Sequence, residues 1–306
     1  MGLDYIIILC GCFDDNYTPL SRAEFWKLYH KYGDSVSGIV ESDEERVKTL
    51  LERSGSIAFA IEKLEEMGIK IITFLDSEFP ERLFVKLKDL CPPLLYICGD
   101  TNLFRQKYAG YVGSRTIGVN DISWTQMMVE KNIHDKFGIV SGGSKGIDVI
   151  SINYALENGG FAIAFLPDNI KTWIKDKYYR DYIMKGRLLI CSHVSPFALK
   201  TRTSFVSSAM ERNKYIYVQS YATAVVKSDY NKGGTWAGAT EAIKHRWVDV
   251  VVWDNKKYEG NQRLIELGGI PLSDDGERIK MEKPIKVVNE QVSEIQMTFF
   301  DVLEKN

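Results

Sequence analysis

The spacing of hydrophobic residues changes after about residue 75. Before that point, and after a short apolar stretch at residues 5–10, apolar residues recur at the three- and four-residue spacing of amphipathic helices. Ser21 and Ser42 are suitable N-caps, and Gly68 is a suitable helix end. The pattern predicts helices over residues 21–33, 42–53 and 56–67, followed by a short strand over residues 69–74.

From residue 76 onward, short apolar runs alternate with helical stretches. The runs predict strands at residues 95–98, 108–112, 137–140, 161–166, 188–191, 222–226 and 248–253. The stretches between them predict helices at residues 121–134, 147–157, 173–184, from 203 to beyond 209, 237–245 and 261–267. Strands that alternate with helices indicate an α/β fold with a doubly wound, mostly parallel Rossmann-like sheet, preceded by a small helical domain.

The same change of pattern divides the chain into three predicted parts. Residues 1–75 form a helical N-terminal domain, residues 76–280 an extended Rossmann-like domain, and residues 281–306 a C-terminal tail too short for an independent domain. In a parallel sheet, ligands bind beyond the carboxyl ends of the strands. The residues that follow the predicted strands are therefore the first candidates for a functional site.

Composition narrows the class of protein. The 306 residues are 45% hydrophobic and 26% charged, which is ordinary for a globular protein, and no window approaches 18 consecutive apolar residues. The start of the chain lacks the basic stretch of a secretory signal. We therefore expect a cytoplasmic protein without a membrane span. Because the net charge is −2, any contact with nucleic acid must come from a local patch.

Cysteine and histidine give no sign of a metal site. The five cysteines are an odd number without a C-x-x-C pair, which indicates reduced thiols, and the four histidines are scattered. Cys191 and His193 lie close in sequence, but no acid or amide is placed to orient the histidine. We expect no metal, no cofactor and no catalytic residue.

The best local motif follows the strand predicted at residues 137–140. Glycines there let the backbone approach a ligand closely, and free N–H groups at the start of the next helix favour phosphate. The spacing is neither that of a Walker loop nor that of the dinucleotide fingerprint, and a tight turn that merely needs glycine is the alternative. The candidate residues are Ser141, Gly142, Gly143, Lys145 and Gly146.

Two further segments repeat this arrangement after the strands predicted at residues 108–112 and 222–226. Arg115, in the first of them, can grip a phosphate with two parallel hydrogen bonds. Three glycine-rich strand ends on one sheet indicate a shared anion-binding cleft. The two segments contribute Gly113, Ser114 and Arg115, and Gly233, Gly234 and Thr235.

A polar cluster lies in the helix that begins near residue 203. Arg212, Asn213 and Lys214 suit contacts with a phosphate or nucleotide, although a solvated helix face explains them as well. Asp148, after the first glycine loop, can receive a ribose hydroxyl or cap the loop, and we favour a structural role. Tyrosines at 178, 179 and 182 alternate with basic residues, which suits base stacking, while packing on the sheet is the other interpretation.

The order of these motifs resembles that of the DprA/Smf family of DNA-processing proteins. The likeness covers roughly residues 70–270. The matching segments are residues 76–83, 91–99, 112–115, 141–148, 155–156 with 159–160, 186–189, 205 with 212–214, 233–236 and 260–265.

The resemblance implies an extended Rossmann fold that binds single-stranded DNA, forms a homodimer and hands DNA to the RecA recombinase during natural transformation. The family is not known for enzymatic activity. The DNA contacts that the resemblance implies are Gly113, Ser114, Arg115, Ser141, Gly142, Lys145, Arg212, Asn213 and Lys214.

Departures from the family pattern indicate a divergent member. Ile152 stands where the family usually has a histidine, Cys191 and Ser192 replace a Ser-Glu pair, and residues 166–169 replace a glycine-rich turn. From the length after residue 280 we also expect no winged-helix domain of the kind that many members carry at the C-terminus. A specialised role, for instance in defence or in a toxin–antitoxin system, is therefore an alternative to DNA uptake.

Two other functions stay open on the sequence. Residues 141–143 and 233–235, with Glu241 as an acidic residue, also resemble nucleotide-binding LOG-like proteins, which are phosphoribohydrolases or nucleotide sensors. The proline and the spacing of their motif are not matched. The third possibility is a scaffold that binds only a protein partner.

Overall fold

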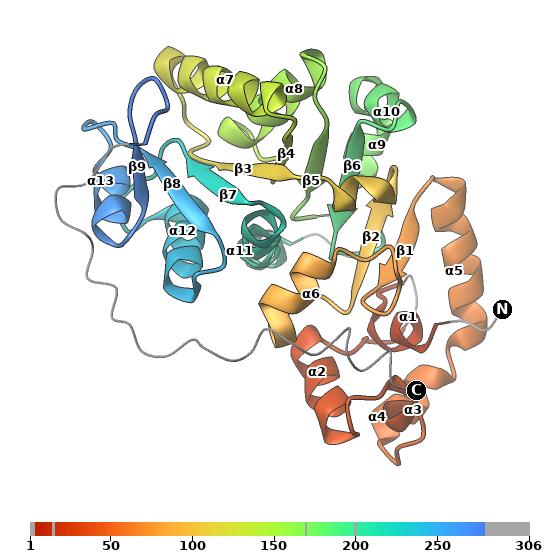
Figure 1. The fold of residues 1–306 in the computed structure, drawn as a ribbon. Coiled ribbons are helices and arrows are strands. Elements are labelled where there is room, and N and C mark those ends of the chain that lie inside the picture. The colour runs from red at the N-terminus through yellow and green to blue at the C-terminus, as the bar shows by residue number, and fades with distance from the viewer. Residues whose placement is uncertain (1–3, 14–15, 169, 199–200, 279–306) are drawn as a thin grey trace, which may run out of the picture.

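The computed structural model describes residues 4–13, 16–168, 170–198 and 201–278 (Figure 1). Its N-terminal region is helical, as predicted. Ser21 closes a capping box with Glu24 at the start of the second helix, which satisfies backbone N–H groups at the helix end. The helices are α1 (Tyr5–Cys10), α2 (Arg22–Lys31), α3 (Val36–Val40), α4 (Glu45–Leu51) and α5 (Ser54–Glu66).

Two details of this region differ from the prediction. Residues 5–10 form a helix because Asp4 caps it, accepting from the Ile6 amide at 2.7 Å, and because Ile6, Ile8 and Leu9 are buried. Ser42 is not an N-cap, since its hydroxyl donates to the Ile39 carbonyl at 2.6 Å and Glu44 precedes the next helix. The hydroxyl is used to end α3 rather than to begin α4.

Within the described residues, one nine-stranded sheet has the order β1-β2-β6-β5-β4-β3-β7-β8-β9. At one edge, β1 pairs antiparallel with β2, and β2 pairs antiparallel with β6. All remaining neighbours, in the order β6-β5-β4-β3-β7-β8-β9, pair in parallel. The bounds are β1 (Lys70–Thr73), β2 (Leu94–Cys98), β3 (Tyr108–Val112), β4 (Gly138–Ser141), β5 (Ala162–Phe165), β6 (Leu188–Ser192), β7 (Ala222–Val225), β8 (Asp249–Trp253) and β9 (Ile270–Leu272).

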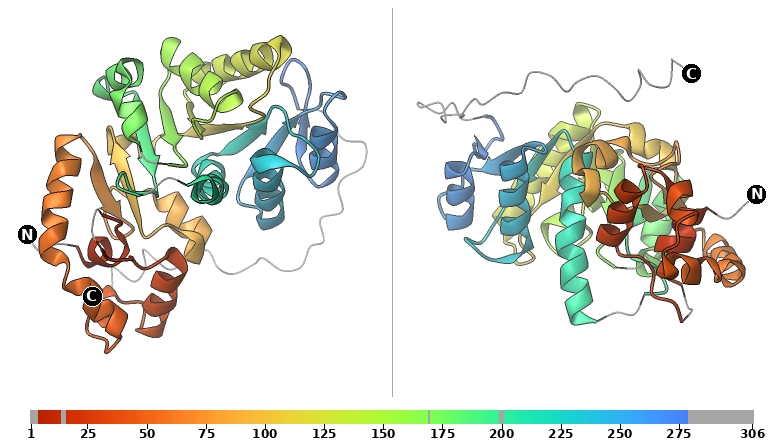
Figure 2. Two further views of the ribbon diagram at one scale, coloured as in Figure 1. Left: turned by 180° about the vertical axis from the view of Figure 1, so that it is seen from behind. Right: turned by 90° about the horizontal axis from the view of Figure 1, so that it is seen from below.

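Helices cover both faces of the sheet (Figures 1 and 2). One face carries α7 (Val119–His134), α8 (Ile147–Glu157), α9 (Lys171–Lys175) and α10 (Lys177–Met184). The opposite face carries α6 (Glu81–Leu87), α11 (Arg202–Gln219), α12 (Gly233–His245) and α13 (Glu259–Glu266), and short 3-10 turns occupy η1 (Lys88–Leu90) and η2 (Thr101–Arg105). The predicted doubly wound α/β fold with a helical N-terminal region is confirmed.

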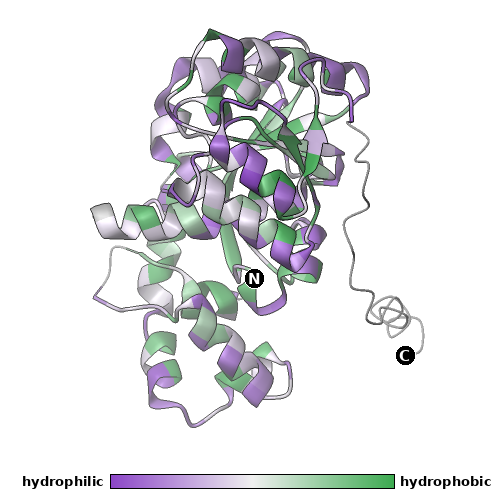
Figure 3. Cartoon of the chain, turned by 90° about the vertical axis from the view of Figure 1, so that its left-hand side faces the viewer, coloured by the Kyte–Doolittle hydropathy of each residue, from purple (hydrophilic) through white to green (hydrophobic). Residues whose placement is uncertain are grey.

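The central strands are apolar on both sides because both faces are covered. Every residue of β2, β4, β5 and β6 is buried. Figure 3 shows hydrophobic strands inside the molecule. In the described part of the chain, no helix is long and apolar enough to cross a membrane.

Other boundaries depart from the prediction for local reasons. The helix predicted at 173–184 is two helices, because Asp176 adopts an extended conformation and caps α10 through the Tyr178 amide. The helix predicted from residue 237 already begins at Gly233. β1 pairs with β2 although the predicted domain boundary places it on the helical side. The predicted tail, 281–306, lies outside the described residues.

Candidate functional site

The order of the strands creates a crevice between β3 and β7. After β3 the chain continues through β4, β5 and β6 on one side, and it then returns through α11 to β7 on the other side of β3. The loops that follow the two strands stay close, since the Ser114 amide donates to the Lys227 carbonyl at 2.9 Å. Such a reversal at the carboxyl ends of parallel strands is where open α/β sheets bind ligands.

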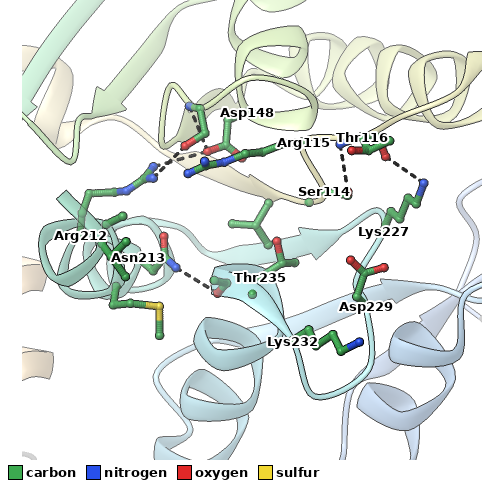
Figure 4. A pocket seen from close by; sticks show the side chains of 18 of the residues that line it. Ser114, Arg115, Thr116, Asp148, Arg212, Asn213, Lys227, Asp229, Lys232 and Thr235 are labelled. Atoms are coloured by element: carbon green, nitrogen blue, oxygen red, sulfur yellow. Dashed lines mark hydrogen bonds and ion pairs between the residues drawn. The ribbon is translucent and has the colours of Figure 1, made fainter. Parts of the chain in front are cut away.

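A cavity of about 580 Å³ lies at this point (Figure 4). Its walls come from the loop after β3, the start of α8, one side of α11, the loop after β7 and the first turn of α12. The lining residues are Val112, Gly113, Ser114, Arg115, Thr116, Ser144, Asp148, Phe205, Val206, Ala209, Met210, Arg212, Asn213, Tyr217, Lys227, Asp229, Lys232, Gly233, Gly234 and Thr235.

Arg212 reaches from α11 into the glycine loop after β4. Its side chain is 3% exposed, and Nη1 lies 3.4 Å from the Oδ2 of Asp148, whose side chain is 9% exposed. The guanidinium also donates to the Phe165 carbonyl at 3.3 Å and to Ser144 Oγ at 3.2 Å. Arg212 thus ties α11 to the loop and to the end of β5.

Burial works against both charges of this pair. It raises the pKa of the Asp148 carboxyl, and the Arg212 guanidinium opposes that rise. It lowers the pKa of Arg212, and Asp148 opposes that fall. Each group therefore depends on the other to stay ionised, and removing one would leave a buried charge without compensation.

The glycines of this loop are needed for close packing against the protein itself. A Cβ at Gly142 would lie 1.0 Å from Nη1 of Arg212, and a Cβ at Gly146, where φ is +90°, would lie 2.3 Å from the Ser114 carbonyl oxygen. Ser141 is buried and donates to the Tyr111 carbonyl at 2.6 Å. The inner side of the loop is thus covered by other parts of the chain.

The first turn of α12 is open instead. Its N-cap, Lys232, provides no side-chain hydrogen bond, and a Cβ at Gly233 would meet nothing within 4 Å. Asn213 Nδ2 donates to the Gly234 carbonyl at 3.0 Å, which fixes the turn against α11. The first amides of a helix have no partner inside it and carry a partial positive charge. Gly233, Gly234 and Thr235 line the cavity with such a turn.

Cationic side chains surround the mouth of the cavity. Arg115 is exposed, with its guanidinium carbon 5.9 Å from the centre of the Phe205 ring, and Lys232 is exposed beside the open turn. Neither has an ion-pair partner among the residues that the structure describes. Lys227 instead donates to the Thr116 carbonyl at 2.8 Å and lies 3.8 Å from Asp121. Asp229 is the exposed acidic residue of the lining.

The structure therefore divides the sequence-predicted contacts into two groups. Eight of them line the cavity: Gly113, Ser114, Arg115, Arg212, Asn213, Gly233, Gly234 and Thr235. Six do not: Ser141, Gly142, Gly143, Lys145, Gly146 and Lys214. Lys145 is exposed on the glycine loop outside the cavity lining.

Lys214 is engaged elsewhere. Its Nζ lies 3.2 Å from Oε1 of Glu241 on α12, and neither side chain lines the cavity. Glu241 is the acidic residue that the LOG-like alternative requires. In this structure it pairs with Lys214 and does not line the cavity.

Sequence reasoning missed the residue that supports the loop after β7. Asn261 is fully buried, accepts from the Ser228 amide at 2.8 Å and donates to the carbonyls of Val226 and Trp253, both at 2.9 Å. It holds the ends of β7 and β8 together and so positions the segment that leads to Lys232. The available signal was the Gly260-Asn261 pair, which belongs to the last of the segments that carry the family likeness.

Sequence reasoning also missed an apolar wall on α11. Val206 and Met210 are one turn apart and are 55% and 38% exposed, and Phe205 and Ala209 line the cavity beside them. Exposed apolar residues four positions apart on a helix were the signal. The tyrosines of α10 do not line the cavity; Tyr179 stacks on Trp173, with ring centres 3.9 Å apart.

The Cys191 and His193 pair has no reactive character. Burial raises the pKa of the Cys191 thiol well above its ordinary value and lowers that of His193 to about 4. A protonated, buried thiol is a poor nucleophile.

Comparison with known families shows the family to which the chain belongs. The sequence profile of the DNA recombination-mediator protein A family matches residues 70–281, which is more than half of the chain. The chain belongs to this family. The resemblance to DprA/Smf proteins is thereby confirmed.

Two solved structures of the family share the fold. DNA processing protein A from Streptococcus pneumoniae is 20% identical, with a TM-score of 0.63 over 83% of this chain and 95% of that one. The Helicobacter pylori protein is 22% identical, with a TM-score of 0.52 over 66% of this chain and 90% of that one. The sequence matches no curated protein.

Proposed function

We propose that this DprA-family chain binds single-stranded DNA at the cavity between β3 and β7. The observation that carries the proposal is the uncapped first turn of α12, which faces the same cavity as Arg115. Backbone phosphates would lie on the turn and beside Arg115 and Lys232, because a helix N-terminus and unpaired cations both attract anions. The relative from Helicobacter pylori is described as having a unique single-stranded DNA binding mode.

The apolar wall favours a single strand over a duplex. Val206, Met210 and the partly exposed Phe205 stand beside the phosphate-binding groups. A single strand exposes its base faces to such side chains, whereas a duplex hides them. Arg115 above the Phe205 ring adds a cation beside an aromatic face.

The proposal gives the remaining predicted contacts different roles. Arg212, with Asp148, holds the glycine loop of residues 141–146 in place and acts as a positioning residue. Lys145 is exposed beside the cavity, so a strand that leaves the mouth across the loop would meet it. A direct phosphate contact at Lys145 stays a prediction, which the single variant Lys145→Ala tests.

Fluorescence-anisotropy titration of a labelled oligo-dT, beside a duplex of equal length, tests the proposal. We expect strand-selective binding that weakens steeply with salt, and a large loss in the double variant Arg115→Ala, Lys232→Ala. The control Lys63→Ala, Arg105→Ala removes the same charge at two exposed positions outside the cavity lining. Equal losses in both double variants, or no binding at low salt, would reject the proposal.

Transfer of the strand to a RecA-type recombinase and formation of a homodimer are further proposals, supported by family membership. Light scattering during gel filtration measures the dimer. Recombinase filament assembly on single-stranded DNA that already carries this protein measures the transfer. A monomer at micromolar concentration, or unchanged filament assembly, would reject the respective proposal.

A further inference from the structure

One acidic side chain of the cavity has no role in the binding of backbone phosphates. Asp229 is exposed and lines the cavity, and Figure 4 shows its carboxylate between the side chains of Lys227 and Lys232. The carboxylate has no hydrogen bond or ion pair with another residue that the structure describes, whereas Lys227 is engaged by the Thr116 carbonyl and by Asp121. An ionised carboxylate only accepts hydrogen bonds and repels a phosphate. Its partner in a ligand is therefore a hydrogen-bond donor.

The backbone that carries Asp229 is fixed by its neighbours. The Ser228 amide donates to Asn261 at 2.8 Å, and the Ser228 hydroxyl lies 3.4 Å from the Asp229 carbonyl oxygen. A Cβ at Gly260 would come within 2.2 Å of the Ser228 carbonyl oxygen, so the start of α13 packs directly on this peptide. A residue that discriminates between ligands needs such a preformed position.

The groups around Asp229 suit one nucleotide of a strand. The cavity of about 580 Å³ falls within the range of about 300–1,000 Å³ that is usual for small-ligand sites. The turn at Gly233 and Gly234 attracts the phosphate, and Met210 offers apolar surface to a base. Because Asp229 repels the phosphate, the edge of the base is the part of the nucleotide that can bind it. These edges are free in a single strand and paired in a duplex.

The four bases differ in what their edges offer to a carboxylate. Guanine presents two adjacent donors, N1–H and the N2 amino group, which match the two carboxylate oxygens. Cytosine and adenine present one amino group beside an acceptor nitrogen. Thymine presents a single N3–H between two carbonyl oxygens, which repel the carboxylate. Guanine is therefore the best partner for Asp229 and thymine the poorest.

We propose that Asp229 is a specificity-determining residue that makes this chain prefer guanine, within a single strand, at the cavity between β3 and β7. The inference rests on the proposed function, because the phosphate-binding groups bring the strand to the cavity. It adds a base preference, which contacts with phosphates cannot supply.

Anisotropy titrations with three labelled strands of equal length test the inference: oligo-dT, alternating dT–dG, and alternating dT–dI, whose hypoxanthine base lacks the N2 amino group. We expect dT–dG to bind about tenfold more tightly than oligo-dT, as one bidentate contact with a base gives. The dT–dI strand should lose most of this gain.

The variant Asp229→Asn separates a base contact from base stacking, which also favours guanine over thymine. It keeps one acceptor and adds a donor that suits the thymine carbonyls, so the preference for dT–dG over oligo-dT should fall about fivefold or more. The matched control is Asp181→Asn, which removes the same charge from an exposed position on α10 outside the cavity lining. It should keep the wild-type preference.

The outcomes distinguish this inference from the proposed function. Equal affinities for the three strands, or an unchanged preference in Asp229→Asn, would overturn the inference and leave the proposed function standing. Tighter binding of all three strands by one common factor in Asp229→Asn would show that the carboxylate only repels phosphates, and would overturn it as well. Absence of binding by every strand at low salt would reject the proposed function together with this inference.

Discussion

Two glycine-rich segments of this molecule, one after β4 and one after β7, look alike in sequence and differ in space. In the first, a Cβ at Gly142 would collide with Arg212, and the buried Arg212–Asp148 pair packs against the loop. In the second, Gly233 has free space around it, and α12 begins without a side-chain cap. The comparison teaches that glycine spacing indicates close approach, while packing decides whether a ligand or the protein itself makes that approach.

The largest expected effect comes from removing the pair that fills the first segment. Arg212→Met should lower the free energy of unfolding by about 3–5 kcal/mol, because the buried Asp148 loses its cationic partner. Urea unfolding measures it. The double variant Arg212→Met, Asp148→Asn should recover part of the loss. A single variant as stable as the wild type would show that the pair does not support the loop.

A matched pair of glycine variants sharpens the comparison. Gly142→Ala should destabilise the protein by about 2–3 kcal/mol, since the new methyl group displaces the Arg212 guanidinium. Gly234→Ala should cost much less stability, because its Cβ would meet only the side-chain end of Asn213, whose Nδ2 at 3.3 Å has to shift by a few tenths of an ångström. It should instead weaken DNA binding by covering the open turn. Unfolding and anisotropy on both variants test this, and the reverse outcome would refute the contrast.

The buried side of α11 also predicts a dependence on pH. Burial lowers the pKa of His193 to about 4. The Glu211 carboxylate acts to raise this pKa, whereas the cations of Arg212, Arg22 and Lys214 lower it further. Between pH 6.5 and 4 the unfolded chain therefore binds a proton that the folded chain does not. Stability should fall by about 2 kcal/mol from about pH 7 to about pH 5. In His193→Gln this fall, measured by urea unfolding, should largely vanish; an equal fall in the variant would contradict the assignment.

The smallest expected change is in the salt dependence of binding, and it concerns the open segment. Each cation lost from a single-strand contact reduces the slope of log affinity against log salt by about 0.7. Arg115→Ala with Lys232→Ala should therefore make the slope shallower by about 1.4. Anisotropy titrations at three or more salt concentrations measure it. An unchanged slope would remove both side chains from the phosphate contacts.

Much of the fold was predictable because the signals are local. Alternating apolar runs and helical stretches predicted β3 to β8, and Ser21 correctly marked the start of α2. The split at Asp176 and the cap at Glu44 escaped because one extended residue decides each. β9 escaped because a three-residue edge strand that contains Pro271 has too weak a pattern.

The site was predictable only in part. Sequence order identified the strand ends that meet at the cavity, since parallel strands bring their carboxyl ends together. It could not distinguish Arg115, which is exposed, from Arg212, which is buried against Asp148, because that depends on how α11 crosses the sheet. Asn261 acts through long-range packing that no local motif reports.

Hydrogen–deuterium exchange of the backbone amides, with and without a saturating single-stranded oligonucleotide, tests the central claim most directly. The account predicts that the oligonucleotide protects residues 113–116 and 233–236, while residues 142–146 exchange at the same rate in both states. Protection confined to residues 142–146, with none at the start of α12, would contradict it and would make the first glycine loop the binding segment.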